Sequence, residues 1–158
     1  MNLAYVAGLV DGEGCIGFTQ CRSNMIPRIC ITNTNKKLIE MLYYKFGGCI
    51  FNAKRVKSNW KEAYHWVVTS KAAIEFLEKI QKYLILKFEQ ALCLQAYECI
   101  RPGKGKRWDC EGKEAMKLLK DQIHWLNKKG FHNDPEPIKI VLDAIAYSEA
   151  RQGKKKKK

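Results

Sequence analysis

Two carboxylates lie two residues apart near the start of the chain, at Asp11 and Glu13, and a glycine follows each of them. Residues 3–10 carry apolar side chains at three- and four-residue spacing, which predicts a short amphipathic helix. The glycines Gly12 and Gly14 permit a sharp exit from this helix. Because the C-terminus of a helix carries a partial negative charge that adds to the carboxylates, this position favours a bound cation.

The same predicted helix has a face of small residues, on which Asp11 also falls: Ala4, Ala7, Gly8 and Asp11. A face with so little side-chain volume allows a second helix to approach backbone to backbone. We therefore interpret these four positions as a helix–helix interface.

The rest of the chain alternates between pairs of strands and helices, which predicts an α+β fold. In the second strand Ile29 and Ile31 alternate with polar residues, so one of its faces is apolar. Asn33 and Asn35 offer caps for the helix that follows, and Gly47-Gly48 ends it. The predicted strands cover residues 15–22, 25–33, 49–57 and about 63–69, and the predicted helices after the first cover about 36–46, 70–84, 87–100, 113–129 and 137–150.

Residues 6–14, Val-Ala-Gly-Leu-Val-Asp-Gly-Glu-Gly, resemble the motif of the LAGLIDADG homing endonucleases, with Glu13 where the consensus has Asp. The resemblance covers roughly residues 3–100 and implies the αββαββα(α) fold of that family. In this fold a curved antiparallel sheet of four strands forms a saddle, helices cover its back, and its concave face lies on DNA. A single copy of the motif implies the homodimeric branch, in which the small face of the first helix meets its copy.

These interpretations divide the chain into four parts. Residues 1–100 form the LAGLIDADG core, 101–112 a basic loop, 113–150 C-terminal helices packed on the core, and 151–158 a disordered lysine-rich tail. The basic loop is either a solvated connector or a contact to phosphate. The tail adds non-specific attraction to phosphates.

The composition indicates a polyanionic partner. The net charge is +13, and nine basic residues stand against one acid between Arg22 and Lys61. Nucleic acid is the expected partner, although ribosomal or chromatin proteins share such a charge. Seven cysteines without a C-x-x-C pair indicate reduced thiols and an intracellular protein rather than a zinc site. No signal peptide or membrane-spanning segment is expected.

By resemblance, the cation is Mg²⁺, held by Glu13 and by the Gly12 carbonyl, in a site that Mn²⁺ or Ca²⁺ could also occupy, Ca²⁺ without cleavage. Mg²⁺ typically takes one or two carboxylates, with water and phosphate oxygens completing its shell. Asp11 corresponds to the first Asp of the motif, for which the resemblance implies a structural role.

Two further positions match the catalytic residues of the family. Asn33 ends the second strand and would orient the attacking water, or serve as a helix cap, or both. Lys87 corresponds to the lysine at the start of the helix after residue 86, where a cation polarises the scissile phosphate or assists the nucleophile. The alternative for Lys87 is an ordinary surface residue, and Lys37 is a weaker candidate for the same pocket.

A sheet in the major groove presents alternate side chains to base edges. Alternation selects Thr19 and Cys21 in the first strand and Arg28, Cys30 and Thr32 in the second. In the third strand it selects Asn52 and Lys54, which leaves Arg55 and Lys57 for phosphates. The fourth strand is ambiguous, since Trp66 either faces DNA or belongs to the core. Arg28 and Lys54 are the strongest candidates for base contacts, with phosphate contacts as the alternative.

The sequence therefore predicts a homodimeric, Mg²⁺-dependent endonuclease that cuts double-stranded DNA at a long pseudo-palindromic site. The alternative is a binder that does not cut, either an intron maturase acting on RNA or a DNA-binding regulator. A general basic RNA-binding protein is a third reading. No membrane partner is expected. No small-molecule cofactor is expected either. Residues 12–17 match G-x-G-x-x-G, but they lack the strand before and the helix after that dinucleotide binding needs.

Overall fold

The structure is a computed structural model that describes residues 1–21, 24–54, 59–103, 106–129 and 146. The chain divides into two compact units, Met1–Phe88 and Glu89–Lys158. The described part of the first unit contains α1 (Leu3–Glu13), β1 (Gly14–Cys21), β2 (Asn24–Asn33), α2 (Lys36–Phe46), β3 (Cys49–Asn52), β4 (Tyr64–Thr69), α3 (Ser70–Ile80) and the 3-10 helix η1 (Gln81–Tyr83). After these elements come α4 (Phe88–Ile100) and α5 (Cys110–Lys129). The predicted order α-β-β-α-β-β-α-α is confirmed.

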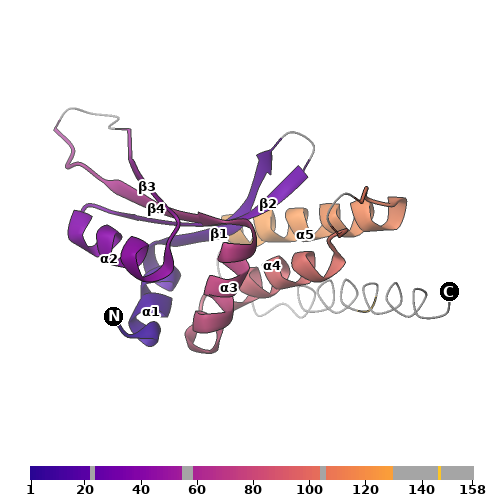
Figure 1. Cartoon of the computed structure of the whole chain (residues 1–158), viewed down its shortest axis with the longest axis horizontal. Coiled ribbons are helices and arrows are strands. Elements are labelled where there is room, and N and C mark those ends of the chain that lie inside the picture. Colours follow the sequence, from indigo (N-terminus) through magenta and orange to yellow (C-terminus); the bar gives the residue numbers. More distant parts are fainter. Residues whose placement is uncertain (22–23, 55–58, 104–105, 130–145, 147–158) are drawn as a thin grey trace. The chain divides into compact units, whose positions relative to one another are not determined.

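The four strands form one antiparallel sheet in the order β1-β2-β4-β3. Helices α1, α2 and α3 lie on one side of this sheet, and the ends of the β1–β2 and β3–β4 pairs rise on the other side (Figure 1). The covered face carries fully buried side chains of three strands, including Ile16, Ile29, Ile31 and Trp66. The predicted alternation of Ile29 and Ile31 toward the core is therefore confirmed.

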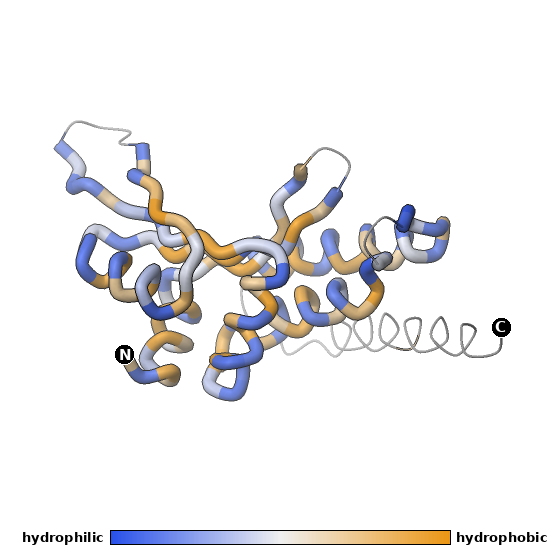
Figure 2. The backbone as a smooth tube through the Cα atoms, in the orientation of Figure 1, coloured by the Kyte–Doolittle hydropathy of each residue, from blue (hydrophilic) through white to orange (hydrophobic). Residues whose placement is uncertain are grey.

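The core of the first unit forms where the helices meet this face. Hydrophobic stretches of the strands run across the middle of the sheet, above the apolar sides of the helices (Figure 2). Three aromatic rings pack edge to face at its centre: the Phe76 ring lies 5.0 Å from that of Trp66 and 4.9 Å from that of Phe46. Burial of such large side chains is the main stabilising contribution to the unit.

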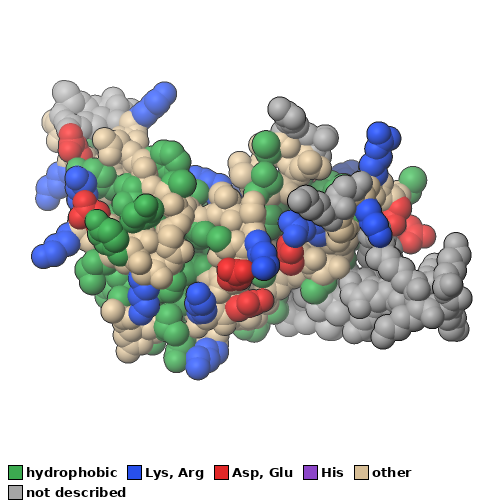
Figure 3. Space-filling view, in the orientation of Figure 1, with side chains coloured by type: hydrophobic (Ala, Val, Ile, Leu, Met, Phe, Trp, Pro, Cys, Tyr) green, Lys and Arg blue, Asp and Glu red, His purple; other side chains and the backbone are tan. Residues whose placement is uncertain are grey.

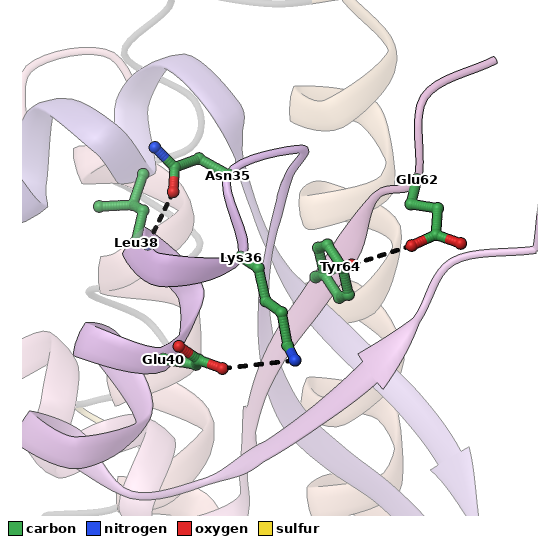
Figure 4. A network of polar contacts seen from close by, with 6 residues as sticks. All are labelled: Asn35, Lys36, Leu38, Glu40, Glu62 and Tyr64. Atoms are coloured by element: carbon green, nitrogen blue, oxygen red, sulfur yellow. Dashed lines mark hydrogen bonds and ion pairs between the residues drawn. The ribbon is translucent and has the colours of Figure 1, made fainter.

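Both ends of α2 follow the predicted signals. The side-chain oxygen of Asn35 accepts a hydrogen bond of 3.2 Å from the Leu38 backbone N–H, which makes Asn35 the N-cap (Figure 4). Nearby, the Lys36–Glu40 ion pair and the hydrogen bond from Tyr64 to Glu62 are exposed contacts of small energetic weight. At the other end Gly47 adopts a φ of 71°, which only glycine reaches without strain.

Three predicted boundaries differ clearly from the structure. The helix predicted over 70–84 ends at Ile80 and is followed by the 3-10 helix η1. The strand predicted over 49–57 ends at Asn52, and residues 55–58 lie outside the described residues. The helix predicted from Lys113 begins at Cys110, because the Asp109 carboxylate accepts a hydrogen bond of 2.8 Å from the Gly112 N–H and so satisfies a donor of its first turn.

In the second unit both helices bury apolar side chains. Leu94, Tyr97 and Ile100 of α4 and Leu119, Ile123 and Leu126 of α5 are each less than one-tenth exposed. The helix predicted over 137–150 and the tail over 151–158 lie outside the described residues, except for Ala146. In the part of the chain that the structure describes, no helix combines the length and hydropathy needed to cross a lipid bilayer.

Candidate active site and nucleic-acid interface

The C-terminal end of α1 presents a carboxylate to solvent. Glu13 is the last residue of the helix and is exposed, as is Gly12 before it. The chain then enters β1 at once through Gly14, where an added Cβ would lie 2.5 Å from the Val10 carbonyl oxygen. A side chain at position 14 would therefore push the strand away from the helix, which makes glycine a requirement for this placement of Glu13.

Asn33, at the end of β2, is the side chain that contacts Glu13. Its amide Nδ2 donates a hydrogen bond to Oε2 of Glu13, and its Oδ1 accepts one of 2.7 Å from the Asn35 N–H. The second bond requires an oxygen at that end of the amide, so the two bonds together fix which way the amide points. Asn33 is thus not the N-cap of α2, which is Asn35, and its amide group is available to the carboxylate.

Asp11 connects α1 to the segment that precedes α4. Its carboxylate accepts a hydrogen bond of 2.8 Å from the Ile85 N–H and one of 3.0 Å from the Lys87 N–H. These residues lie more than 70 positions apart in the chain. Both carboxylate oxygens are therefore used within the chain, which agrees with a structural role rather than a metal ligand.

The side chain of Lys87 also contacts Asp11. The half-buried ammonium donates to the Asp11 backbone carbonyl, one of the last carbonyls of α1. Burial lowers the pKa of Lys87 below its ordinary value, while the nearby groups of Asp11 and Cys15 oppose the shift. Glu13, Asn33 and Lys87, which the sequence predicted as catalytic, all contact or form part of the last turn of α1.

We expect Asp11→Ala to lower the free energy of unfolding by about 2–3 kcal/mol, because two backbone N–H groups lose their acceptor. Urea unfolding followed by circular dichroism measures this loss. Asp121, an exposed aspartate on α5, provides the matched control, for which we expect a change within about 0.5 kcal/mol. Equal effects of the two substitutions would show that the Asp11 bonds do not hold the 84–87 segment in solution.

The donors at the end of α1 fit a hard cation. One Glu13 oxygen receives the Asn33 bond, and a carboxylate has capacity for further partners at its other oxygen. Carboxylate and carbonyl oxygens are ligands that Mg²⁺ and Ca²⁺ prefer. Among the described residues, no group of three or more His, Cys, Asp or Glu side chains could hold a metal ion by itself. At the end of α1 the described residues place one exposed carboxylate, that of Glu13, so a cation bound there would need further oxygens from other partners.

The face of the sheet opposite the helices carries five of the eleven predicted DNA contacts. Pairing of Gly17 with Arg28 and of Cys15 with Cys30 places the odd residues of β1 and the even residues of β2 on this open face. It therefore includes the predicted set Thr19, Cys21, Arg28, Cys30 and Thr32, of which Cys30 is buried, at 7% exposure, and so is not available for a contact with DNA. The surface is hollowed between the two raised strand pairs (Figure 3). Contact of the other four side chains with DNA remains a prediction.

Two predicted DNA contacts lie on the wrong face. Trp66 is completely buried and its Nε1 donates a hydrogen bond of 2.8 Å to the Gly47 carbonyl, so Trp66 is a core residue. Asn52 pairs with Tyr64 and therefore shares the side of the sheet that Trp66 occupies. Lys37 and Lys54 are exposed, whereas Arg55 and Lys57 lie outside the described residues.

The same register adds residues that the sequence did not single out. His65 and Phe51 pair with each other and lie on the open face, and the Phe51 side chain is 54% exposed. Alternation from a buried Trp66 would have indicated His65, but the sequence left the orientation of β4 undecided.

The prediction that Ala7 lies on the small face of α1 used for a helix–helix interface is wrong. Ala7 is fully buried in the core of its own unit, together with Val6 and Val10. The exposed small residues are Ala4, Gly8 and Gly12, spaced four apart on one side of the helix. Ala7 therefore cannot contribute to an interface with another chain.

Comparisons with known proteins agree with this architecture. Residues 1–81 match the family model described as a LAGLIDADG-like domain. No curated protein sequence matches the chain significantly.

Solved structures of homing endonucleases share the fold. I-CvuI in complex with its target superposes with a TM-score of 0.63 at 19% identity, over 90% of this chain and 93% of that one. The archaeal intron-encoded I-Vdi141I in complex with DNA gives a TM-score of 0.63 at 19% identity, over 94% and 96%. I-SmaMI bound to cleaved DNA gives 0.57 at 21% identity, over 84% of this chain but 46% of that one.

Proposed function

Because the chain belongs to the LAGLIDADG homing endonuclease family, we propose that it is a site-specific endonuclease that cuts double-stranded DNA as a homodimer. The observation that carries the proposal is the arrangement at the end of α1. There an exposed Glu13 carboxylate is bonded to the Asn33 amide, and Lys87 is fixed to the same helical turn. A protein that only binds nucleic acid has no need of this combination.

Glu13 and the Gly12 carbonyl would hold a divalent cation, Mg²⁺ for cutting, with Ca²⁺ supporting binding alone. When bound, the cation supplies an activated water and neutralises charge that develops on the phosphate. The Asn33 amide orients the Glu13 carboxylate and can direct a water beside it. The Lys87 ammonium supplies a positive charge for the scissile phosphate or its leaving oxygen.

Two observations support the homodimer. The chain corresponds to nearly the whole of I-CvuI and I-Vdi141I but to less than half of I-SmaMI, so it contains one copy of the fold. The exposed stripe of Ala4, Gly8 and Gly12 lets α1 meet a second α1 closely. Two-fold symmetry about that contact would bring two Glu13 carboxylates together at the centre, which supplies the oxygens that one chain lacks.

We expect Gly8→Ala to weaken this dimer by roughly tenfold or more in dissociation constant. Within the chain an added Cβ at Gly8 meets nothing within 4 Å, and alanine favours a helix over glycine by about 1 kcal/mol. Any loss of association must therefore arise between chains. Sedimentation equilibrium measures it, with Lys71→Ala on the exposed side of α3 as the control. A wild-type chain that sediments as a monomer with and without DNA would refute the homodimer.

The function itself is tested with a large library of random duplexes. Purified protein is mixed with the library and Mg²⁺, and the cut ends are sequenced. Discrete cuts at a partly palindromic site are the expected result. Enrichment of bound duplexes without cuts would instead favour the regulator, and binding of structured RNA without a preferred duplex would favour the maturase. Binding without any sequence preference would indicate a general basic nucleic-acid binder.

A further inference from the structure

His65 lies at the middle of a row of side chains on the open face of the sheet. It pairs with Thr32 of β2 on one side and with Phe51 of β3 on the other. Thr32 directly precedes Asn33, whose amide contacts Glu13. The row therefore lies close to the candidate catalytic carboxylate, and closer along β2 than Arg28 does.

The imidazole ring of His65 is oriented by a neighbour. Its Nδ1 lies 2.7 Å from the Thr32 hydroxyl oxygen, a good hydrogen-bond length, and 3.9 Å from the Cys30 sulfur, a weak contact. The ring is partly exposed, and among the described residues its Nε2 has no hydrogen-bond partner. One ring nitrogen is thus fixed by the sheet, and the other remains for a ligand on the open face.

The Thr32 hydroxyl and the His65 Nδ1 can each donate or accept the hydrogen bond between them. If the Thr32 hydroxyl donates to Nδ1, the neutral ring carries its proton on Nε2 and presents a donor. If the hydroxyl accepts from Nδ1–H, Nε2 presents a lone pair instead. The ring keeps its position in either state, so the same point in space offers a donor or an acceptor without a change of rotamer.

This behaviour matches a particular feature of base pairs. In the major groove the adenine N6 donor and the guanine O6 acceptor occupy corresponding positions, and so do the cytosine N4 donor and the thymine O4 acceptor. A protein group that can both donate and accept a hydrogen bond can therefore bond to adenine N6 or guanine O6, and likewise to cytosine N4 or thymine O4. Because the purine 6-group and the pyrimidine 4-group are displaced from one another along the base pair, a ring held in place by Thr32 reaches one class better than the other.

We propose that His65, held by Thr32, reads one base pair in each half of the target and that it distinguishes purine from pyrimidine while tolerating transitions. His65 is then a specificity-determining residue and Thr32 its positioning residue. The inference rests on the proposed function, because it needs duplex DNA on the open face of the sheet.

The test measures base preference at every position of the half-site, for binding in Ca²⁺ and for cutting in Mg²⁺. With the wild type we expect one base pair near the cleavage point where a transition is tolerated and a transversion is disfavoured by roughly three- to tenfold, the weight of one hydrogen bond. His65→Ala should abolish that preference and leave the other positions unchanged. Arg28→Ala should affect a different position, further from the cleavage point.

Variants of Thr32 test whether its hydroxyl positions the His65 ring or whether the volume of its side chain alone matters. Thr32→Val keeps the shape but loses the hydroxyl, and we expect it to lose the purine–pyrimidine distinction. Thr32→Ser keeps the hydroxyl and should retain it. His124→Ala, at the exposed histidine of α5, is the matched histidine control and should leave the profile unchanged.

Two results would overturn the inference. One is a base-preference profile that His65→Ala leaves unchanged at all positions of a duplex that the wild type binds or cuts; the proposed endonuclease would then still stand. The other is a wild type that neither binds nor cuts any duplex, which would remove the inference together with the proposed function. A Thr32→Val profile equal to that of the wild type would remove the positioning role alone.

Discussion

We expect Glu13→Gln to lose DNA cleavage by on the order of a thousandfold or more, while it binds the same duplex within a few-fold of the wild type. The substitution removes the negative charge that a divalent cation needs. It leaves an amide oxygen of the same shape, which can still accept the hydrogen bond from Asn33. The fold and the open face of the sheet should therefore be preserved.

Single-turnover cleavage in Mg²⁺ and equilibrium binding in Ca²⁺ measure the two quantities separately. Glu75→Gln is the matched control, since Glu75 is an exposed glutamate on α3 whose contact is an ion pair of 3.2 Å with Lys71. The control should cut at the wild-type rate. Wild-type cutting by Glu13→Gln would mean that the cation is held elsewhere.

Replacement of Lys87 should have the second largest effect. We expect Lys87→Met to slow cleavage by about a hundredfold or more, because the site loses its positive charge. In the role proposed for Lys87 the protonated form is the active one, and burial lowers the pKa of Lys87 from the ordinary 10.5. As the pH rises, cleavage should therefore decline before pH 10.5 is reached, because the ammonium loses its proton earlier than that of an ordinary lysine.

Lys87→Arg tests whether the decline of cleavage at high pH comes from loss of the proton at position 87. A guanidinium stays protonated throughout the range, so the variant should lack the alkaline decline even though its geometry lowers the rate. Lys79→Met, on the exposed side of α3, is the matched control and should keep both the rate and the profile. A rate that rises through the pKa of Lys87 would instead make its neutral amine a general base.

The sequence predicted the parts of the candidate site that depend on local pattern. Helical spacing over residues 3–10 and the glycines after it identified the end of α1 and thus Glu13. Strict alternation around Ile29 and Ile31 identified the open face of β2. In both cases the residues that decide the structure are neighbours in the chain.

The predictions were wrong where contacts between residues distant in the sequence determine which way a side chain faces. In β4 both faces contain apolar residues, Trp66 on one and Val67 on the other, so alternation alone could not orient the strand. The orientation depends on a partner 19 positions away, the Gly47 carbonyl, which binds the indole N–H. Ala7 was assigned to the wrong face because a small residue fits a helix–helix contact and a close contact with the core equally well.

The bonds of Asp11 could not have been found from the motif alone. They join α1 to backbone groups at Ile85 and Lys87, and a backbone N–H has no signature in the sequence. The resemblance implied that Asp11 is structural, and the structure gives the reason.

The attachment of the candidate catalytic groups to one helical turn has a consequence for redesign. Glu13 belongs to α1, Asn33 reaches it through a side-chain bond, and Lys87 is tied to it through Asp11. Arg28 and His65 take no part in these bonds. If the chain is the endonuclease proposed above, a new target could therefore be selected by exchanging residues on the open face while the groups at the end of α1 are left intact. Recognition and cleavage would then be separable modules of one small scaffold.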